Sequence, residues 1–508
     1  MNLLTKEQAQ KLDRIAISFK QMAIPGVELM GKAGSEVAEY VQNMIAGIAN
    51  PKIAIICGKG NNAGDGYKAA IDLYKNGLHP YLIIASDKKE IEGDSLFYYK
   101  QCVKNNISIT HSSKPPTEKY DLIVDALLGT GFTGELRTPI LEYTKWINKQ
   151  KSLVLSVDIP TGVNANNGNV AKHTVNADVT ITMGMAKVGM AIEPGKSLCG
   201  DIIPVDIGFP DIYNELPGSK YRMADEDLAY KYLRAPDINT YKHRQGKVLI
   251  IAGSCGMTGA AILASNGAMR SGVGLVKVFA PKSLNNIYEA NIIEGLTICC
   301  EDDGKGFFTL QNYSEIEKYF DWSDTILIGP GLGLNKSTKE LVKKVVTNYT
   351  KPLIIDADGL SIFNDNVKLF RDIKGEFIIT PHYGEFASLL NTTTKEIIGN
   401  ITDYLEKFMN GFEGTLVAKN APTFISYGKN IVINSTGNQG LATGGAGDVL
   451  TGVIASFAAQ GIPSNIAAEL GVFIHGKAAD LVAEQKGYRG MIASDLLGML
   501  PKAIMTYE

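Results

Sequence analysis

Residues 53–57 read Ile-Ala-Ile-Ile-Cys, an uninterrupted apolar run that is followed directly by a glycine-rich segment, residues 58–66. A strand that is buried on both faces shows no polar alternation, so such a run is typical of a parallel sheet covered by helices. Residues 122–124 and 153–157 repeat the pattern, with helical stretches between them. Helices are also expected before the first strand, at residues 6–19 and 27–48. The chain therefore begins with an α/β unit built on a parallel sheet.

A break in composition separates this unit from a second one. The region 209–240 is rich in proline and charge, so we place a domain boundary near Gly218. Buried apolar runs then resume, at residues 247–253, 325–328, 353–356, 377–380 and 415–418. We therefore expect an α/β protein of two domains, which span residues 1–218 and 225–508.

Composition and charge exclude several classes of protein. The chain has 508 residues and a formal net charge of −3, so no basic field favours nucleic acid as a partner. The first residues lack the features of a signal peptide, and no apolar run is long enough to span a bilayer. The six cysteines are scattered without metal-site spacing, which is typical of reduced thiols. We expect a cytoplasmic protein without a membrane partner.

Polar and glycine-rich loops follow three successive strands of the first domain. They are residues 58–66, Asp125 with residues 129–135, and residues 158–162. Any one of them alone could be a tight turn with an aspartate at a helix N-terminus. Ligands bind beyond the carboxyl ends of parallel strands, however, so three such loops together predict one crevice.

The loop types suggest that different residues of that crevice bind phosphate, bind a cation and transfer a proton. The backbone amides of residues 61–65 are suited to hold phosphate. Asn62, Asp125 and Thr161 offer hard oxygen ligands, which suit an alkali or alkaline-earth cation. Asp158 is then a candidate proton carrier.

Several separated strings of the first domain resemble the NAD(P)H-hydrate epimerase domain. They are LMGKAG (29–34), GKGNNAGDG (58–66), DALLGTGFTG (125–134), SVDIPTG (156–162) and Lys187-Val188-Gly189. The resemblance implies a Rossmann-like fold, interconversion of the R and S forms of hydrated NADH and NADPH (NADHX and NADPHX), and potassium on Asn62, Asp125 and Thr161. It implies that substrate contacts Asn61, Asn62, Ala63, Gly64, Asp65, Gly129, Thr130, Gly131, Phe132, Thr133, Gly134, Glu135 and Asp158.

Two positions of this domain depart from the family pattern. Ala63 replaces the usual glycine, and its methyl group matters if the residue needs a positive φ. Thr161 replaces a common serine but keeps the hydroxyl oxygen, so the cation site is not in doubt.

The second domain contains a loop of small residues, Gly444-Gly445-Ala446-Gly447-Asp448, followed at once by an apolar helical run. The amides of such a loop and the helix N-terminus together form a binding site for an anion, typically a phosphate. A carboxylate beside an anion-binding site is unfavourable unless it transfers a proton or binds a metal. The loop therefore predicts phosphoryl chemistry next to a base.

The second domain resembles the ADP-dependent NAD(P)H-hydrate dehydratase domain of the ribokinase-like superfamily. The matching strings are GSCGMTGAAILA (253–264), GPGLG (329–333), DADGL (356–360), TPHYGE (380–385) and TGNQGLATGGAGDVLTG (436–452). The resemblance implies that Ala261, Gly331 or Gly333, His382 and Asp448 face the hydrated nicotinamide. It places the adenine nucleotide on Lys419, Asn420, Ala421, Pro422, Thr423, Gly445 and Gly447.

Some assignments in this domain carry alternatives. A histidine that follows proline in a loop is most often solvated or caps a helix, so His382 has an ordinary interpretation besides substrate binding. Asn420 replaces the usual glycine, and Ala446 replaces threonine or methionine, which affects nucleotide preference more than the chemistry.

The two resemblances together imply a repair enzyme. Asp448 would take the proton of the substrate hydroxyl while ADP or ATP, with Mg²⁺, phosphorylates it, and elimination then restores NADH or NADPH. The alternative is a vitamin or sugar kinase fused to a ligand-binding Rossmann-like module. The expected partners are small-molecule substrates only, and the expected assembly is a homo-oligomer, a tetramer or larger.

Overall fold

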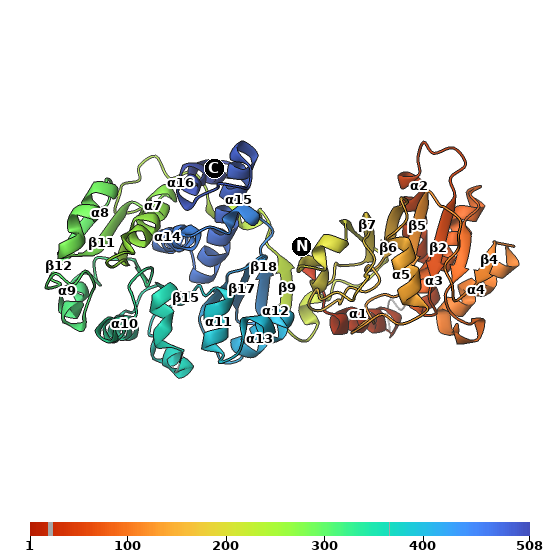
Figure 1. Cartoon of the computed structure of the whole chain (residues 1–508), viewed down its shortest axis with the longest axis horizontal. Helices are drawn as coiled ribbons and strands as arrows, with labels where there is room; N and C mark the ends of the chain where they lie inside the picture. Colours follow the sequence, from red (N-terminus) through yellow and green to blue (C-terminus); the bar gives the residue numbers. More distant parts are fainter. Residues whose placement is uncertain (19–23, 365) are drawn as a thin grey trace. The chain divides into compact units, whose positions relative to one another are not determined.

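The computed structural model describes residues 1–18, 24–364 and 366–508, and these divide into two compact units (Figure 1). One unit is Asn2–Arg222, and the other is Met1 together with Met223–Glu508. Within the described residues, no helix is long and apolar enough to cross a membrane.

The N-terminal unit is built on a parallel sheet with the strand order β4-β3-β2-β5-β6-β7-β8. Its strands are β2 (Ile53–Cys57), β3 (Tyr81–Ile84), β4 (Ile109–His111), β5 (Leu122–Ala126), β6 (Leu153–Val157), β7 (Val179–Met183) and β8 (Asp201–Val205). Its helices are α1 (Lys6–Ser18), α2 (Gly26–Met44), α3 (Asn61–Lys75), α4 (Gly93–Lys104) and α5 (Ile140–Ile147). A short strand β1 (Asn2–Leu3) pairs with β9 (Lys220–Met223).

Both faces of this sheet are covered, as the apolar runs predict. Ile53, Ile55 and Cys57 of β2 belong to a core shared with α2, α3 and α4. Ala54 and Ile56 of the same strand belong to a second core that includes α5. The uninterrupted run at residues 53–57 thus arises because alternate side chains enter two different cores.

The C-terminal unit is built on a second sheet, in the order β18-β17-β16-β15-β14-β13-β10-β11-β12. The strands from β16 to β12 in this order are parallel, and β16, β17 and β18 are antiparallel. They are β10 (Lys247–Ile251), β11 (Leu275–Pro281), β12 (Leu296–Cys300), β13 (Thr325–Ile328), β14 (Leu353–Ile355), β15 (Phe377–Ile379), β16 (Thr415–Ala418), β17 (Phe424–Tyr427) and β18 (Asn430–Ile433).

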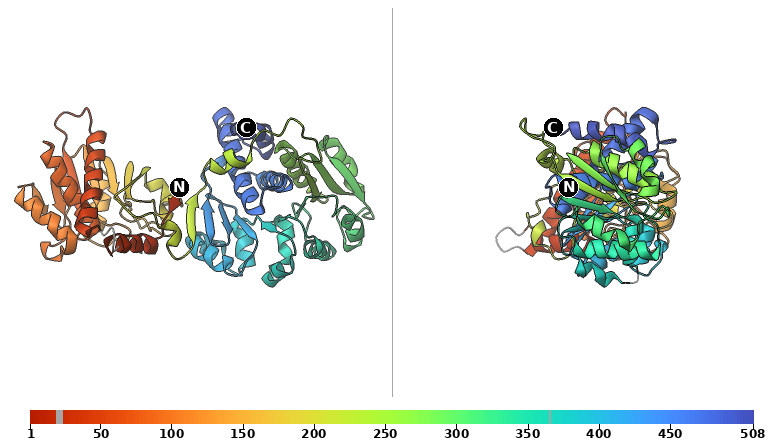
Figure 2. Two further views of the ribbon diagram at one scale, coloured as in Figure 1. Left: turned by 180° about the vertical axis from the view of Figure 1, so that it is seen from behind. Right: turned by 90° about the vertical axis from the view of Figure 1, so that its left-hand side faces the viewer.

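Helices lie on both sides of this second sheet (Figures 1 and 2). They are α6 (Asp227–Tyr232), α7 (Thr258–Arg270), α8 (Asn285–Asn291), α9 (Tyr313–Glu317), α10 (Lys336–Asn348), α11 (Tyr383–Leu389), α12 (Thr394–Gly399), α13 (Ile401–Met409), α14 (Ala446–Ala459), α15 (Ser464–Lys486) and α16 (Ala493–Met505).

Helix α14 packs closely on α7 through glycine. A methyl group added at Gly452 would lie 2.1 Å from the carbonyl oxygen of Ala264, and one at Gly267 would lie 2.7 Å from that of Val449. Only glycine permits this approach of the two backbones. The contact fixes α14, and with it the loop of small residues at its N-terminus.

The sequence predictions of fold class and strands are confirmed. The predicted runs at residues 53–57, 153–157 and 325–328 coincide with β2, β6 and β13. The first predicted helix ends at Phe19, which lies outside the described residues. The second is shorter than predicted, since α2 ends at Met44 and Gly47 then turns the chain with φ +94°.

Candidate active sites

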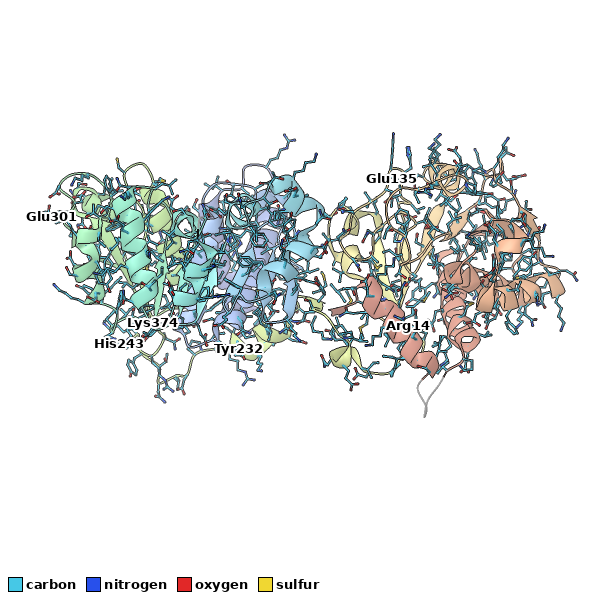
Figure 3. All side chains as sticks on the ribbon, turned by 90° about the horizontal axis from the view of Figure 1, so that it is seen from below. Arg14, Glu135, Tyr232, His243, Glu301 and Lys374 are labelled. Carbon is cyan, nitrogen blue, oxygen red and sulfur yellow. The ribbon has the colours of Figure 1, made fainter. Side chains whose placement is uncertain are left out.

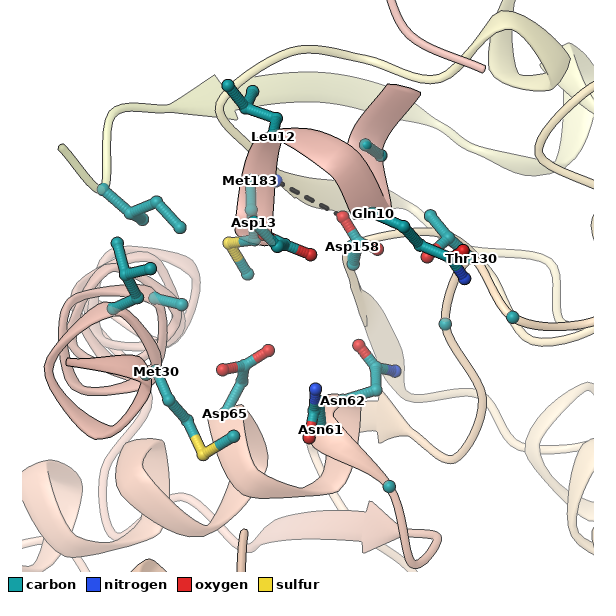
Figure 4. Close-up of a pocket in the computed structure, with 18 of the residues that line it drawn as sticks. Gln10, Leu12, Asp13, Met30, Asn61, Asn62, Asp65, Thr130, Asp158 and Met183 are labelled. Carbon is teal, nitrogen blue, oxygen red and sulfur yellow. Dashed lines mark hydrogen bonds between the residues drawn. The ribbon is translucent and has the colours of Figure 1, made fainter. Parts of the chain in front are cut away.

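In the N-terminal unit, the loops after β2, β5 and β6 meet at one edge of the sheet because these strands are neighbours. They line a pocket of about 560 Å³ together with residues of α1 and α2 (Figure 4). The crevice predicted from three strand ends is therefore present in the structure.

The residues assigned to substrate by resemblance divide into two groups. Those that line the pocket are Asn61, Asn62, Asp65, Gly129, Thr130, Gly131, Phe132 and Asp158. Ala63 and Gly64 are buried inside α3, and Thr133, Gly134 and Glu135 are exposed, with Glu135 on the outer surface in Figure 3. Ala63 has no positive φ, so its methyl group causes no backbone strain.

Asp158 is held in a strained conformation by specific contacts. Its φ of +66° is uncommon for residues other than glycine, although aspartate adopts it more readily than most, and such conformations cluster at functional sites. The amine of Lys187, which is only 2% exposed, donates a hydrogen bond to Asp158 Oδ1. The amide of Met183 donates to the same oxygen at 3.4 Å (Figure 4).

Asp65 and Asp13 are among the further carboxylates that line this pocket. Asp65 on α3 is buried, and burial together with the charge of Asp158 raises its pKa well above the ordinary value. Partial burial in the pocket wall and the charge of Asp158 raise the pKa of Asp13 on α1 to about 6, although solvent still reaches the side chain. Sequence reasoning missed Asp13, because an aspartate on the polar face of a helix is ordinarily expected to be exposed to solvent.

Of the three residues predicted to bind a cation, Asn62 lines the pocket, whereas Asp125 and Thr161 are fully buried and are not among the lining residues. The Asp125 carboxylate is buried and accepts hydrogen bonds from the Thr161 amide at 2.9 Å and the Thr161 hydroxyl at 2.7 Å. Burial raises the pKa of Asp125, and these hydrogen bonds oppose the rise. Both amide atoms of Asn62 are buried and lack a hydrogen-bond partner within the described residues. The free oxygen of Asn62 is what a cation ligand requires.

In the C-terminal unit, the loop of small residues forms the N-terminus of α14. Gly445 caps the helix with φ +86°, and Asp448 lies in its first turn. The amine of Lys419 lies beside this turn, since a methyl group added at Gly447 would be 3.2 Å from it. The positive charge and the free amides of the helix end together suit an anion such as phosphate.

Acidic residues surround Lys419 and Asp448. Lys419 Nζ donates to Asp356 Oδ1 at 2.7 Å, and the Thr380 hydroxyl donates to the same oxygen at 2.7 Å. Burial and the charge of Asp356 raise the pKa of Asp448 to about 6, against the opposing charge of Lys419. A carboxylate with such a pKa is suited to accept a proton near neutral pH.

The glycines after β13 adopt conformations that other residues avoid. Gly331 has φ +61°, and Gly333 has φ +78° and donates its amide to Asp358 Oδ2 at 2.8 Å. The Ser254 hydroxyl donates to the Gly331 carbonyl at 2.8 Å, which joins this loop to the one after β10. Ala261 is fully buried in α7 behind that loop.

His382 caps helix α11. Its Nδ1 accepts hydrogen bonds from the amides of Gly384 at 3.0 Å and Glu385 at 3.2 Å. The neutral ring therefore carries its proton on Nε2, which lies 3.4 Å from Glu385 Oε1. This is the capping role that the sequence left open, and contact with substrate stays a prediction.

Residues 419–423 form the connection between β16 and β17. The Lys419 amide donates to the carbonyl of Pro381, so this connection lies beside the His382 loop. Asn420 and Ala421 are exposed. Burial raises the pKa of the Tyr383 hydroxyl in the neighbouring loop, and the Asn420 side chain opposes this rise.

Comparisons with known proteins match both units. A family described as NAD(P)H-hydrate dehydratase matches residues 248–502, and one described as YjeF-related protein N-terminus matches residues 26–189. The bifunctional NAD(P)H-hydrate repair enzyme of Moorella thermoacetica is 33% identical, covering 100% of this chain and 97% of its own. That of Dictyoglomus turgidum is 32% identical, with 99% and 98% covered. The chain belongs to the family of bifunctional NAD(P)H-hydrate repair enzymes.

A solved structure resembles the C-terminal unit of this repair enzyme. It is the ADP/ATP-dependent NAD(P)H-hydrate dehydratase of Bacillus subtilis, co-crystallised with ATP and Mg²⁺, which is 26% identical with a TM-score of 0.49. The match covers 56% of this chain and 98% of that one. Family membership confirms the predicted fold classes and the predicted activities, an epimerase and a dehydratase, over the alternative of a vitamin or sugar kinase.

Proposed function

We propose that this enzyme restores hydrated NADH and NADPH in two successive steps. The domain over residues 1–218 interconverts the R and S forms, and the domain over residues 225–508 dehydrates the S form at the expense of ADP or ATP. One observation carries the second step: Asp448, with its pKa raised to about 6, lies in the first turn of α14 beside the Lys419 amine.

The dehydratase chemistry follows from the substrate, whose ring carries a hydroxyl group in place of a double bond. Hydroxide is a poor leaving group, so the hydroxyl is first phosphorylated. Asp448 accepts the hydroxyl proton, the oxygen bonds to the terminal phosphorus, and the shortened nucleotide leaves. Phosphate then leaves with a proton from the neighbouring carbon, which restores the double bond. The Gly444–Gly447 amides and Lys419 stabilise the phosphoryl charge.

A Mg²⁺ ion bound here would neutralise charge on the nucleotide phosphates. Within the described residues, no group of three or more acidic, histidine or cysteine side chains is arranged to hold a metal. This donor set fits an ion that arrives with the nucleotide phosphates rather than one held in a protein cage. Residues 420–423, Gly445 and Gly447 are the proposed nucleotide contacts, and Ala261, Gly331, Gly333 and His382 are the proposed substrate contacts.

In the epimerase domain, we assign substrate to residues 61–65, residues 129–135 and Asp158. Potassium is assigned to Asn62, Asp125 and Thr161, and the buried, unpartnered amide oxygen of Asn62 supports this assignment. A bound cation would add positive charge near the substrate phosphates. Asp158 is the proposed proton carrier, and the hydrogen bond from the Lys187 amine fixes the position of its carboxylate.

The decisive experiment supplies the full chain with an equal mixture of both epimers of hydrated NADH, ADP and Mg²⁺, and follows the absorbance of reduced nicotinamide. We expect a fast phase from the S form and a slow phase that recovers the R form. Recovery that stops halfway refutes the epimerase, and no recovery with ADP or ATP refutes the dehydratase. One inorganic phosphate should appear per NADH restored, whereas a kinase would keep the phosphate on its organic product.

We also propose that the chain works in the cytoplasm as a homo-oligomer, a tetramer or larger. Light scattering on the purified chain tests the assembly, and a monomeric mass at assay concentrations would contradict it.

A further inference from the structure

The epimerase pocket contains more acid–base groups than the proposed function uses. Asp13 comes from α1, Asp65 from α3 and Asp158 from the loop after β6, and all three line the pocket. Figure 4 shows their carboxylates facing the same space. Lys187 supplies the single buried ammonium group of this cluster.

The charges in this cluster do not balance. The Lys187 amine donates hydrogen bonds to Asp158 and, at 2.8 Å, to the Thr182 hydroxyl. Its positive charge is therefore already paired with the Asp158 carboxylate. Within the described residues, neither the Asp13 nor the Asp65 carboxylate makes a hydrogen bond or an ion pair. The other charged groups of the pocket are Asp94 and Lys59, and Lys59 is 61% exposed and binds Glu90 at 3.1 Å. Three carboxylates beside one ammonium group favour retention of a proton among them.

The two unpaired carboxylates differ in accessibility. Asp65 is 9% exposed, whereas Asp13 is open to the pocket and to solvent. Burial holds the pKa of Asp65 well above its ordinary value, while the pKa of Asp13 is about 6. A group that gives and regains a proton in each turnover needs access and a pKa near the working pH, so Asp13 is the better suited of the two.

Inverting the substrate carbon needs both a proton acceptor and a proton donor. That carbon carries a hydroxyl group and a ring nitrogen. When the hydroxyl loses its proton, a carbonyl group forms, the bond from carbon to nitrogen breaks, and the nitrogen takes up a proton. Attack of the nitrogen on the other face of the carbonyl reverses each transfer and gives the opposite epimer.

We propose that Asp13 is the proton donor of the epimerase site, acting opposite Asp158 as the proton acceptor. This inference rests on the proposed epimerase function of the same pocket. Asp158 takes the hydroxyl proton, and Asp13 gives its proton to the ring nitrogen as the ring opens. Both protons return when the ring closes, so the enzyme ends each turnover in its starting state.

The test measures the slow phase of NADH recovery from pH 5 to pH 8 in the full chain, with protein-free epimerisation subtracted. Asp13→Asn is expected to slow this phase about 10²–10⁴-fold and leave the fast phase unchanged. The unmodified chain should lose slow-phase rate as the pH rises above about 6, and the residual rate of Asp13→Asn should lack this decline. Asp13→Glu keeps a donor and should retain both the phase and its decline.

A matched control lies on the same helix. Glu7 is exposed, is outside the pocket and accepts a hydrogen bond from Asn166, so Glu7→Gln should leave both phases unchanged. An unaltered slow phase in Asp13→Asn overturns the proposal. The proposal is also overturned if Asp13→Asn slows this phase but the residual rate still declines as the pH rises, because that result indicates a structural role. Loss of the slow phase in Asp13→Glu overturns it as well. A chain that shows no slow phase before any substitution overturns the epimerase function itself, and this inference with it.

Discussion

The amine of Lys419 lies 2.7 Å from Asp356 Oδ1 and donates a hydrogen bond to it. Lys419 directly follows β16 and Asp356 directly follows β14, so the pair joins two loops on either side of β15. Asp356 is 1% exposed and therefore needs this partner. The pair holds a positive charge in a fixed position beside the first turn of α14.

Replacing Lys419 by methionine should weaken nucleotide binding. A hydrogen bond from a charged group contributes about 1.5–3 kcal/mol, so we expect the KM for ADP in the fast phase to rise about 10- to 100-fold. Lys429→Met is the matched control, because Lys429 is exposed in the turn between β17 and β18. An unchanged KM in Lys419→Met would show that the amine serves only to neutralise Asp356.

The fast phase should depend on the ionisation of Asp448. Its raised pKa means that the proton-accepting form is complete only above about pH 6, so the rate should fall about tenfold for each pH unit below that value. Lys419→Met removes a charge that lowers this pKa, and the bend in the profile should move to higher pH. Asp448→Asn should lose about 10²–10⁴-fold in rate yet still bind ADP in calorimetry. Normal turnover in Asp448→Asn refutes the assignment.

Two adjacent glycines in the loop before α14 should differ in their tolerance of alanine. Gly445 has φ +86°, and a methyl group there would lie 2.5 Å from Leu263 Cδ1, whereas one at Gly444 has no neighbour within 4 Å. We expect Gly445→Ala to lose about 1–2 kcal/mol and to lower the temperature at which the fast phase is lost. Gly444→Ala should stay close to the unmodified chain. Equal effects of the two substitutions would contradict this conformational argument.

Thr161 should link potassium to the slow phase. Thr161→Val keeps the shape but removes a hydroxyl that donates to Asp125 at 2.7 Å and accepts from the Leu128 amide at 3.0 Å. We expect the slow phase to be faster in potassium chloride than in tetramethylammonium chloride, and this difference to disappear in Thr161→Val. Thr161→Ser should preserve it. No difference between the salts in the unmodified chain argues against the cation site.

Asp65 should lower the stability of the folded chain at high pH. Its pKa is higher in the folded state than in the unfolded state, so ionisation favours unfolding, and the penalty grows as the pH rises above about 4. Asp65→Asn should therefore raise the unfolding temperature in calorimetry at pH 8, with a smaller gain at pH 5. Glu7→Gln supplies the comparison, with no gain at either pH. A gain for Asp65→Asn that is largest at pH 5 would reverse the sign and refute the argument.

The sequence predicts those parts of the sites that lie close to strand ends. Asp125, Asp158 and Asp356 each follow an apolar run, and their convergence follows from parallel topology alone. Asp13 gives no such signal, because its place in the pocket depends on how α1 packs against elements far along the chain. Lys187 stands near the end of β7, but its contact with Asp158 depends on backbone geometry that periodicity does not specify.

The pairing of β1 with β9 determines how the N-terminal unit can be engineered. Asn2 lies opposite Arg222 and Leu3 opposite Tyr221, so the chain enters and leaves the N-terminal unit at neighbouring points. A unit with adjacent ends can be cut out, inserted into the loop of another protein or reconnected in a new residue order without disturbing its interior. The adjacent ends therefore make the epimerase portion a candidate for circular permutation.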